Sequence, residues 1–271
     1  MTLNKKRSLG LIALVVLVMV VSFTVFQLNN KKVDGSQVDN PVKLKFGDNF
    51  ISYILEEEGM QFNMFAVQNV KDKNVSLADI VTSVDFDNPN IEIVDYQIDE
   101  GIVHRNHKLT NILVTVKVLG DEVEKANKLV INYKDMNSET YHFGDITVQN
   151  RLSYNDDHLE PSGKYNVGYP TPALDVNVKN AAQQAITPLE INDLTGNFSY
   201  QIESTYTIDP KQVKHIDIEQ IDINREKTPD FTTITPILTY DLGGNEYMYD
   251  MPGVIYGILD ADVDKINKMI D

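Results

Sequence analysis

The sequence predicts a mainly β protein, with an N-terminal transmembrane helix, two β-sandwich domains and a short C-terminal helix. Three observations lead to this prediction. An apolar run without charges covers residues 9–26, and apolar residues then recur at every second position through most of the chain. A stretch rich in proline and glycine, residues 151–173, interrupts this alternation and divides it into two halves.

The apolar run is long enough to cross a membrane. Its only polar side chains belong to Ser22 and Thr24, and about 18 helical residues reach roughly 27 Å, close to the hydrocarbon core of a bilayer. No small-residue cleavage site follows the run, and the chain has no cysteine to carry a lipid. We therefore expect a retained anchor, and the alternative is a cleaved export signal.

The charges beside the run predict its orientation. Lys5, Lys6 and Arg7 precede it and favour an N-terminus in the cytoplasm, against Lys31 and Lys32 on the far side. The bulk of the chain is then expected outside the cytoplasm, at a cell membrane that the chain crosses once. The expected segments are a cytoplasmic tail at 1–8, the anchor at 9–26 and a polar tether at 27–41.

Charge and cysteine content narrow the choice of partner and compartment. The net charge is −16, and all 40 acidic residues lie from Asp34 onward. Such a surface repels nucleic acid, whose binding needs clustered lysine and arginine, so we expect no nucleic-acid partner. An exported domain without cysteine has no disulfides and depends on its core for stability. The combination is typical of a protein of the bacterial cell envelope.

Period-two alternation predicts strands with one buried face in both halves. A first β-domain is expected at 42–150, a linker at 151–173, and a second β-domain with the C-terminal helix at 174–271. Each domain has the length of an immunoglobulin-like sandwich, although the chain lacks the cysteine pair and the tryptophan that antibody domains carry. The clearest alternating stretches are 42–46, 60–66, 112–118, 129–133, 146–148, 174–178, 198–202, 216–218 and 234–240.

Local signals predict three further features. Ser76, followed by Asp79, predicts a capping box that starts a short helix at 77–83. The apolar residues of 91–98 change parity at Val94, which indicates a β-bulge or a strand covered on both faces. Gly243-Gly244-Asn245 suits the turn of a β-hairpin.

Catalytic motifs are absent from the sequence. The chain has no cysteine nucleophile, no G-x-S-x-G or S-x-x-K motif, no H-E-x-x-H motif and no P-loop. The two histidines of His104-Arg-Asn-His107 fall in a segment that reads as a turn between strands. These observations favour a non-catalytic protein that needs no cofactor over an enzyme.

The end of the chain offers a candidate calcium site. Asp260, Asp262, Asp264 and Asp271 occupy the first, third, fifth and twelfth positions of a calcium-binding loop. The sixth position, normally glycine, is Lys265, which weakens the match.

A short amphipathic helix is the favoured reading of the same residues. Its acidic first turn complements the helix dipole, and Val263, Ile266 and Ile270 lie on one side.

The linker offers two more candidate sites. Its acidic group is a second place where calcium could bind, and its tyrosines could form a contact surface for a partner protein. The acidic group consists of Asp156, Asp157 and Glu160, and the tyrosines are Tyr154, Tyr165 and Tyr169.

From the anchor, the β-rich pattern and the missing catalytic motifs, we expect a membrane-anchored, extracytoplasmic, non-catalytic binding or assembly protein of a bacterial cell envelope. Its expected contacts are the membrane, through residues 9–26, and another envelope protein. The alternatives are an extracytoplasmic hydrolase whose site is assembled from distant residues, and the ectodomain of a ligand or cation sensor.

Overall fold

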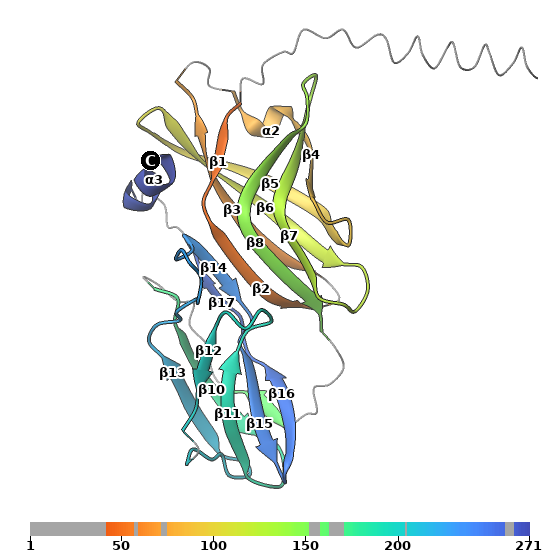
Figure 1. Cartoon of the computed structure of the whole chain (residues 1–271), viewed down its shortest axis with the longest axis vertical. Coiled ribbons are helices and arrows are strands. Elements are labelled where there is room, and N and C mark those ends of the chain that lie inside the picture. Colours follow the sequence, from red (N-terminus) through yellow and green to blue (C-terminus); the bar gives the residue numbers. More distant parts are fainter. Residues whose placement is uncertain are drawn as a thin grey trace, which may run out of the picture. The chain divides into compact units, whose positions relative to one another are not determined.

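The protein is mainly β, as predicted, and its strands form several sheets (Figure 1). A computed structural model describes residues 42–56, 59–71, 75–151, 158–162, 171–203, 205–257 and 263–271. All of these residues belong to one compact unit, Pro41–Asp271.

The first half of the chain forms a β-sandwich. One sheet has four strands, in the order β1 (Leu44–Phe46), β3 (Met60–Asn69), β6 (His107–Val118) and β5 (Ile91–His104). Strands of a six-stranded sheet cover it. The order of that sheet is β17 (Val254–Tyr256), β14 (Phe231–Ile234), β2 (Asn49–Leu55), β8 (Glu139–Asn150), β7 (Glu124–Tyr133) and β4 (Val81–Phe86).

The core of this sandwich confirms the predicted alternation. Every second residue of β6 is buried, and the same holds for the middle of β3 and for β7. These side chains meet those of β2, β4 and β8 in one cluster. The residues at its centre that are at most 1% exposed include Phe62, Met64, Ile112, Val114, Val116, Leu129, Ile131, Phe143, Ile146 and Val148.

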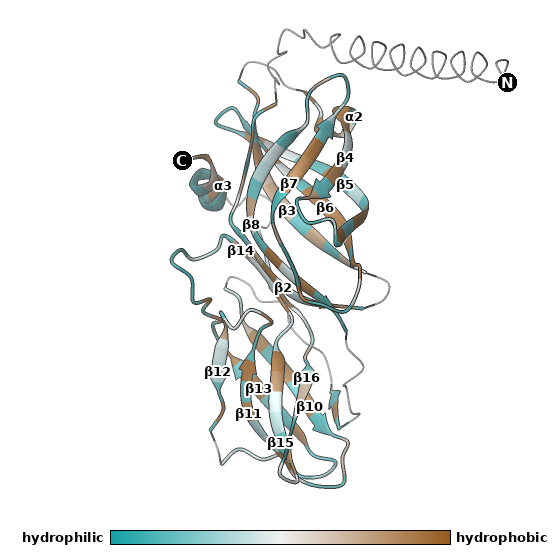
Figure 2. Cartoon of the chain, turned by 45° about the vertical axis from the view of Figure 1, so that its right-hand side comes forward, coloured by the Kyte–Doolittle hydropathy of each residue, from teal (hydrophilic) through white to brown (hydrophobic). Residues whose placement is uncertain are grey.

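The second half of the chain forms another sandwich with its own core. One sheet has the order β13 (Val213–Ile218), β10 (Leu174–Asn180) and β9 (Leu159–Pro161), and the other β12 (Ser199–Gln201), β11 (Ile186–Asn192), β15 (Ile237–Leu242) and β16 (Asn245–Asp250). β9 falls within the stretch 151–173, where three residues are too few to show an alternation. Hydrophobic residues, brown in Figure 2, are concentrated in the strands of both sandwiches.

One strand belongs to both sandwiches. β2 pairs in parallel with β8 on one side and with β14 on the other. Because side chains alternate along a strand, Ile51 enters the first core, whereas Phe50 enters the second. Arg225, in the second half of the chain, also forms ion pairs with two residues of the first half. Its guanidinium lies 3.3 Å from Asp48 and 2.7 Å from Asp145.

The run 234–240, predicted as one strand, is two. β14 ends at Ile234 and β15 begins at Ile237, and the two join different sheets. Pro236 has no N–H to donate to a sheet, which explains the interruption. The predicted strand at 198–202 is likewise reduced to β12, and Tyr200 is 42% exposed.

The predicted helix at 77–83 is shorter, and its capping box is wrong. α2 (Leu77–Ile80) is followed at once by β4, in which Val84 and Phe86 are core residues. Ser76 makes no side-chain capping bond. Instead, the N–H of Leu77 donates to Glu100 Oε1 at 2.6 Å.

The predicted bulge and hairpin turns are confirmed. The pairing of β5 with β6 shifts between Ile93 and Asp95, so that Val94 is the bulged residue and is 44% exposed. β15 and β16 are joined by Gly243 and Gly244, both at positive φ, as a two-residue turn requires. The β5–β6 turn uses Arg105 and Asn106, also at positive φ.

The amphipathic helix predicted at the end of the chain is present as α3 (Val263–Ile270). Its buried residues are Ile266 and Met269, which join Phe231 in a small third cluster. Val263, predicted on the same side, is 38% exposed instead. Lys268 contributes an ion pair of 2.6 Å with Asp230.

The predicted membrane anchor, residues 9–26, lies outside the described residues. Among the helices that are described, neither combines the length and hydrophobicity that crossing a bilayer requires.

Gly144 provides a test of the parallel β2–β8 pairing. Its φ is +108°, and a Cβ there would lie 2.0 Å from the carbonyl oxygen of Asn49. Gly144→Ala should therefore lower the free energy of unfolding by roughly 3 kcal/mol or more, as measured by urea denaturation and circular dichroism. Gly120 is the matched control, because its φ is +100° and nothing lies within 4 Å of its Cβ position. Gly120→Ala should cost only about 1 to 2 kcal/mol, and equal losses would contradict the steric account.

Candidate functional site

Three neighbouring parallel strands end side by side, at the same end of the six-stranded sheet. β14, β2 and β8 run in the same direction, and Leu55, the last residue of β2, is in register with Asn150, the last residue of β8. Each strand is followed by a polar residue, and these are Thr235, Glu56 and Arg151 respectively. The N–H of Arg151 donates to the carbonyl of Leu55 at 2.8 Å, which fixes the chain where it leaves the sheet.

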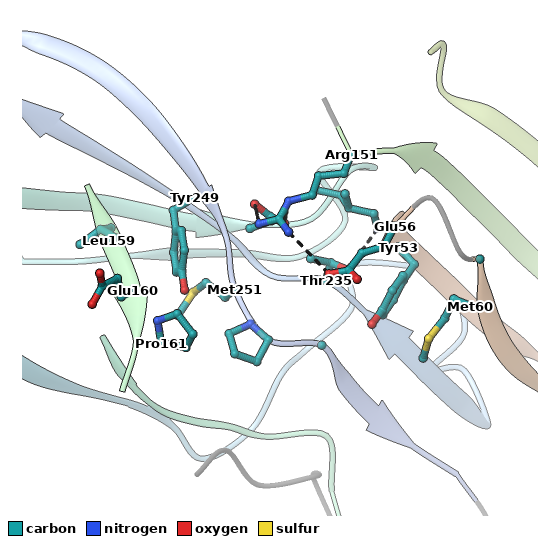
Figure 3. A pocket seen from close by; sticks show the side chains of 15 residues that line it. Tyr53, Glu56, Met60, Arg151, Leu159, Glu160, Pro161, Thr235, Tyr249 and Met251 are labelled. Carbon is teal, nitrogen blue, oxygen red and sulfur yellow. Dashed lines mark hydrogen bonds and ion pairs between the residues drawn. The ribbon is translucent and has the colours of Figure 1, made fainter. Parts of the chain in front are cut away.

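These residues line a groove of about 530 Å³, which Figure 3 shows from close by. The other walls come from the start of β3, from β9, and from the end of β16 with the loop that follows it. The lining residues are Tyr53, Ile54, Glu56, Gly59, Met60, Arg151, Leu159, Glu160, Pro161, Thr235, Tyr249, Asp250, Met251, Pro252 and Gly253.

Arg151 is the central cation of the groove. Its Nε lies 3.0 Å from Asp250 Oδ2, and its Nη2 donates to Asp250 Oδ1 at 3.3 Å. The guanidinium and the carboxylate therefore form a bidentate ion pair. A longer ion pair of 3.5 Å joins Arg151 to Glu56, whose side chain is 77% exposed. Arg151 is therefore occupied by carboxylates of the chain itself, and the groove presents more negative than positive charge.

Two tyrosines supply the aromatic surface. Tyr53 packs edge-on against Phe62, with ring centroids 5.5 Å apart, and it lies so close to Gly253 that a Cβ there would be 2.8 Å from the Tyr53 hydroxyl. Tyr249 is only 7% exposed. Burial raises the pKa of Tyr249 to about 12, with a further upward contribution from Asp250 and an opposing one from Arg151. The hydroxyl of Tyr249 is therefore neutral at physiological pH.

The remaining polar residues are already engaged within the protein. Glu160 forms an ion pair of 2.9 Å with Lys179. The hydroxyl of Thr235 accepts a hydrogen bond from the N–H of Ile54 at 3.1 Å, and Thr235 is buried. None of the described lining residues is a serine, cysteine or histidine, so this lining contains no serine or cysteine nucleophile with a histidine base. The arrangement suits binding, through aromatic, thioether and carboxylate groups.

Among the described residues of the three predicted sites, only Glu160 lines this groove. Asp264 is exposed on α3, and Asp271 is the exposed last residue. In the part of the chain that the structure describes, no three histidine, aspartate or glutamate side chains come together as a metal site. The other predicted residues lie outside the described residues: Asp260, Asp262, Asp156, Asp157, Tyr154, Tyr165 and Tyr169.

The sequence analysis missed the main groove residues. Tyr53 and Arg151 belong to segments almost 100 positions apart, and the parallel pairing of β2 with β8 brings them together. One signal was available. Arg151 comes directly after the alternating apolar residues of β8, and a charged residue in this position marks the point where the strand leaves the sheet.

Comparison with protein-family models and with curated protein sequences found no match for this chain.

The raised pKa of Tyr249 predicts a loss of stability in alkali. An unfolded tyrosine releases its proton near pH 10, whereas folded Tyr249 retains it to about pH 12. Between these values the folded state binds more protons, so stability falls as the pH rises, by roughly 2 to 3 kcal/mol from this group. Tyr249→Phe should remove that part of the pH dependence.

The measurement is urea denaturation at a series of pH values from 8 to 12 (about the range over which tyrosine titrates). Tyr200→Phe is the control, because Tyr200 is 42% exposed and lies away from the groove. Identical pH profiles for the wild type and Tyr249→Phe would contradict the prediction.

Proposed function

We propose that the chain is a membrane-tethered, extracytoplasmic, non-catalytic binding protein of a bacterial cell envelope, and that its groove receives a segment of another envelope protein. The sequence supports the tether through the uncharged run at 9–26, and the cations that precede this run support an exported location for the remainder. The observation that carries the binding role is the groove, whose described lining offers contact surface and no serine–histidine or cysteine–histidine pair.

Strand order supports an immunoglobulin-like topology for the first sandwich. Such domains have one sheet in the order A-B-E-D and a second containing C, F and G. If β1 and β2 are the two parts of strand A, the observed order β1-β3-β6-β5 corresponds to A-B-E-D. The facing order β2-β8-β7-β4 then corresponds to A-G-F-C.

The second sandwich fits the same scheme. The order β9-β10-β13 corresponds to A-B-E, and β16-β15-β11-β12 corresponds to G-F-C followed by one further strand. We therefore propose two immunoglobulin-like domains, one at 42–150 and one that consists of 174–271 together with β9, and the second contributes β14 and β17 to the sheet of the first. Domains of this architecture are frequent in proteins that bind other proteins at cell surfaces, and this agrees with the proposed role as an analogy only.

The chemistry of the groove indicates what it would bind. Tyr53 and Met60, which are partly exposed, present apolar and polarisable surface, which suits an apolar or aromatic side chain of a partner. Glu56, with 77% of its side chain exposed, suits a lysine or arginine. The proposed occupant is accordingly a protein segment that carries both kinds of residue.

A photo-crosslinking amino acid in place of Glu56 tests the proposed binding. In intact cells it should give a discrete adduct with one envelope protein, because the side chain at this position points into an accessible groove. The same amino acid in place of Glu92, which is exposed on β5, is the control and should give no such adduct. Recovery of the chain alone from both variants would refute the binding role.

The absence of cysteine allows a direct test of topology. Glu92→Cys should react with a membrane-impermeant maleimide in intact cells, because the residue is exposed on the extracytoplasmic part of the chain. Thr2→Cys should react only after the membrane is permeabilised. Equal labelling of both positions in intact cells would exclude the proposed orientation.

A further inference from the structure

Beside the groove, the structure contains an edge strand that lacks the usual protection against the addition of another strand. A strand at the edge of a sheet presents unpaired N–H and C=O groups to which another chain can add, and folded proteins usually block such edges. The four sheets of the described residues have eight edge strands, β1, β5, β17, β4, β13, β9, β12 and β16.

Seven of these edges are short, bulged or covered. β1, β9, β12 and β17 have three residues each, and β9 contains Pro161. β5 has two register shifts, and β4 has one next to Val81. On β13, the hydroxyl of Tyr206 donates to the carbonyl of His215 at 2.9 Å, and Lys214 lies over the Tyr206 ring.

β16 is neither short nor bulged, and its described side-chain contacts lie on its inner face, where His158 packs against Tyr247, and at its end, where Arg151 pairs with Asp250. It has six residues, and its pairing with β15 is continuous from Asn245 to Asp250. Its sequence, NEYMYD, contains no proline. Met248, near its middle, is 44% exposed.

The register shows which backbone groups point outward. After a two-residue turn, the closing pair Leu242 and Asn245 is hydrogen-bonded, and bonded and non-bonded pairs then alternate along the hairpin. Tyr247 is therefore bonded to β15, whereas the N–H and C=O groups of Glu246 and Met248 point away from it. No described residue forms a backbone hydrogen bond with either of these two residues on the outer side.

The charge beside this edge indicates what kind of strand would fit. Glu246 stands directly opposite Asp241 on β15, and like charges in such a pair are unfavourable. In the described part of the chain, neither carboxylate forms an ion pair. A lysine or arginine on a strand added beside β16 would offset this repulsion.

We propose that β16 is a strand-addition site for an extended, basic segment of the partner protein. The segment forms main-chain hydrogen bonds with Glu246 and Met248 and places a cation beside Glu246. The last residues of β16, Tyr249 and Asp250, line the groove, so a segment on this edge would continue into it. This inference rests on the proposed binding role and specifies how the partner binds.

The test uses the full chain in detergent micelles and a synthetic nine-residue peptide of alternating valine and lysine (about the length that covers six strand residues). Hydrogen exchange of the Met248 amide should slow by about tenfold or more at saturating peptide. A peptide with glutamate in place of lysine should give no protection. Absence of protection by the lysine peptide, or equal protection by both peptides, would overturn the proposal.

Two variants, each with a matched control, separate the contributions of the backbone and of the charge to binding. Met248→Pro removes the outward N–H without touching the β15–β16 ladder and should abolish binding, whereas Met248→Val should retain it. Glu246→Lys should weaken binding about tenfold, and Glu92→Lys, the same change on β5, should not. Unchanged binding by Met248→Pro would refute strand addition. If it is refuted while the crosslink at Glu56 persists, the binding role stands and only this mode of binding is lost.

Discussion

The structure depends on β2, a strand with a hydrophobic core on each of its faces. Phe50 belongs to the core of the second sandwich, and Ile51 and Leu55 belong to the core of the first. Parallel pairing with β8 and β14 places β2 in the interior of a sheet that both halves of the chain build. Its near-continuous burial, with only Tyr53 half-exposed, follows from this position.

The groove is a consequence of the same pairing. Parallel strands bring their carboxyl ends to one edge, so the residues that follow β2, β8 and β14 are gathered there without being close in sequence. Arg151 then neutralises Asp250 at short range, which allows a carboxylate to be mostly buried at a junction that is otherwise acidic. The ion pair and the neutral phenol of Tyr249 keep the walls of the groove in a defined arrangement.

The sequence was most informative where a strand has one buried face and an antiparallel neighbour. Alternation located β3, β6, β7, β8 and β10, and the bulge at Val94 was visible as a change of parity. Parallel pairing leaves no such signal. β2 is buried on both faces, shows no alternation and was not among the predicted strands, so Arg151 and Tyr53 were not connected. The capping box at Ser76 did not form: the helix has only four residues, and the acceptor at its first N–H, that of Leu77, is the distant Glu100.

α3 connects the end of the described unit to its beginning. β1, the first described strand, is held to β3 by only three residue pairs. α3 lies against the same two strands, and Lys45 donates to the carbonyl of Ile270 at 3.4 Å. The first strand and the last helix of the described unit are therefore packed against each other, and β1 has a neighbour besides β3.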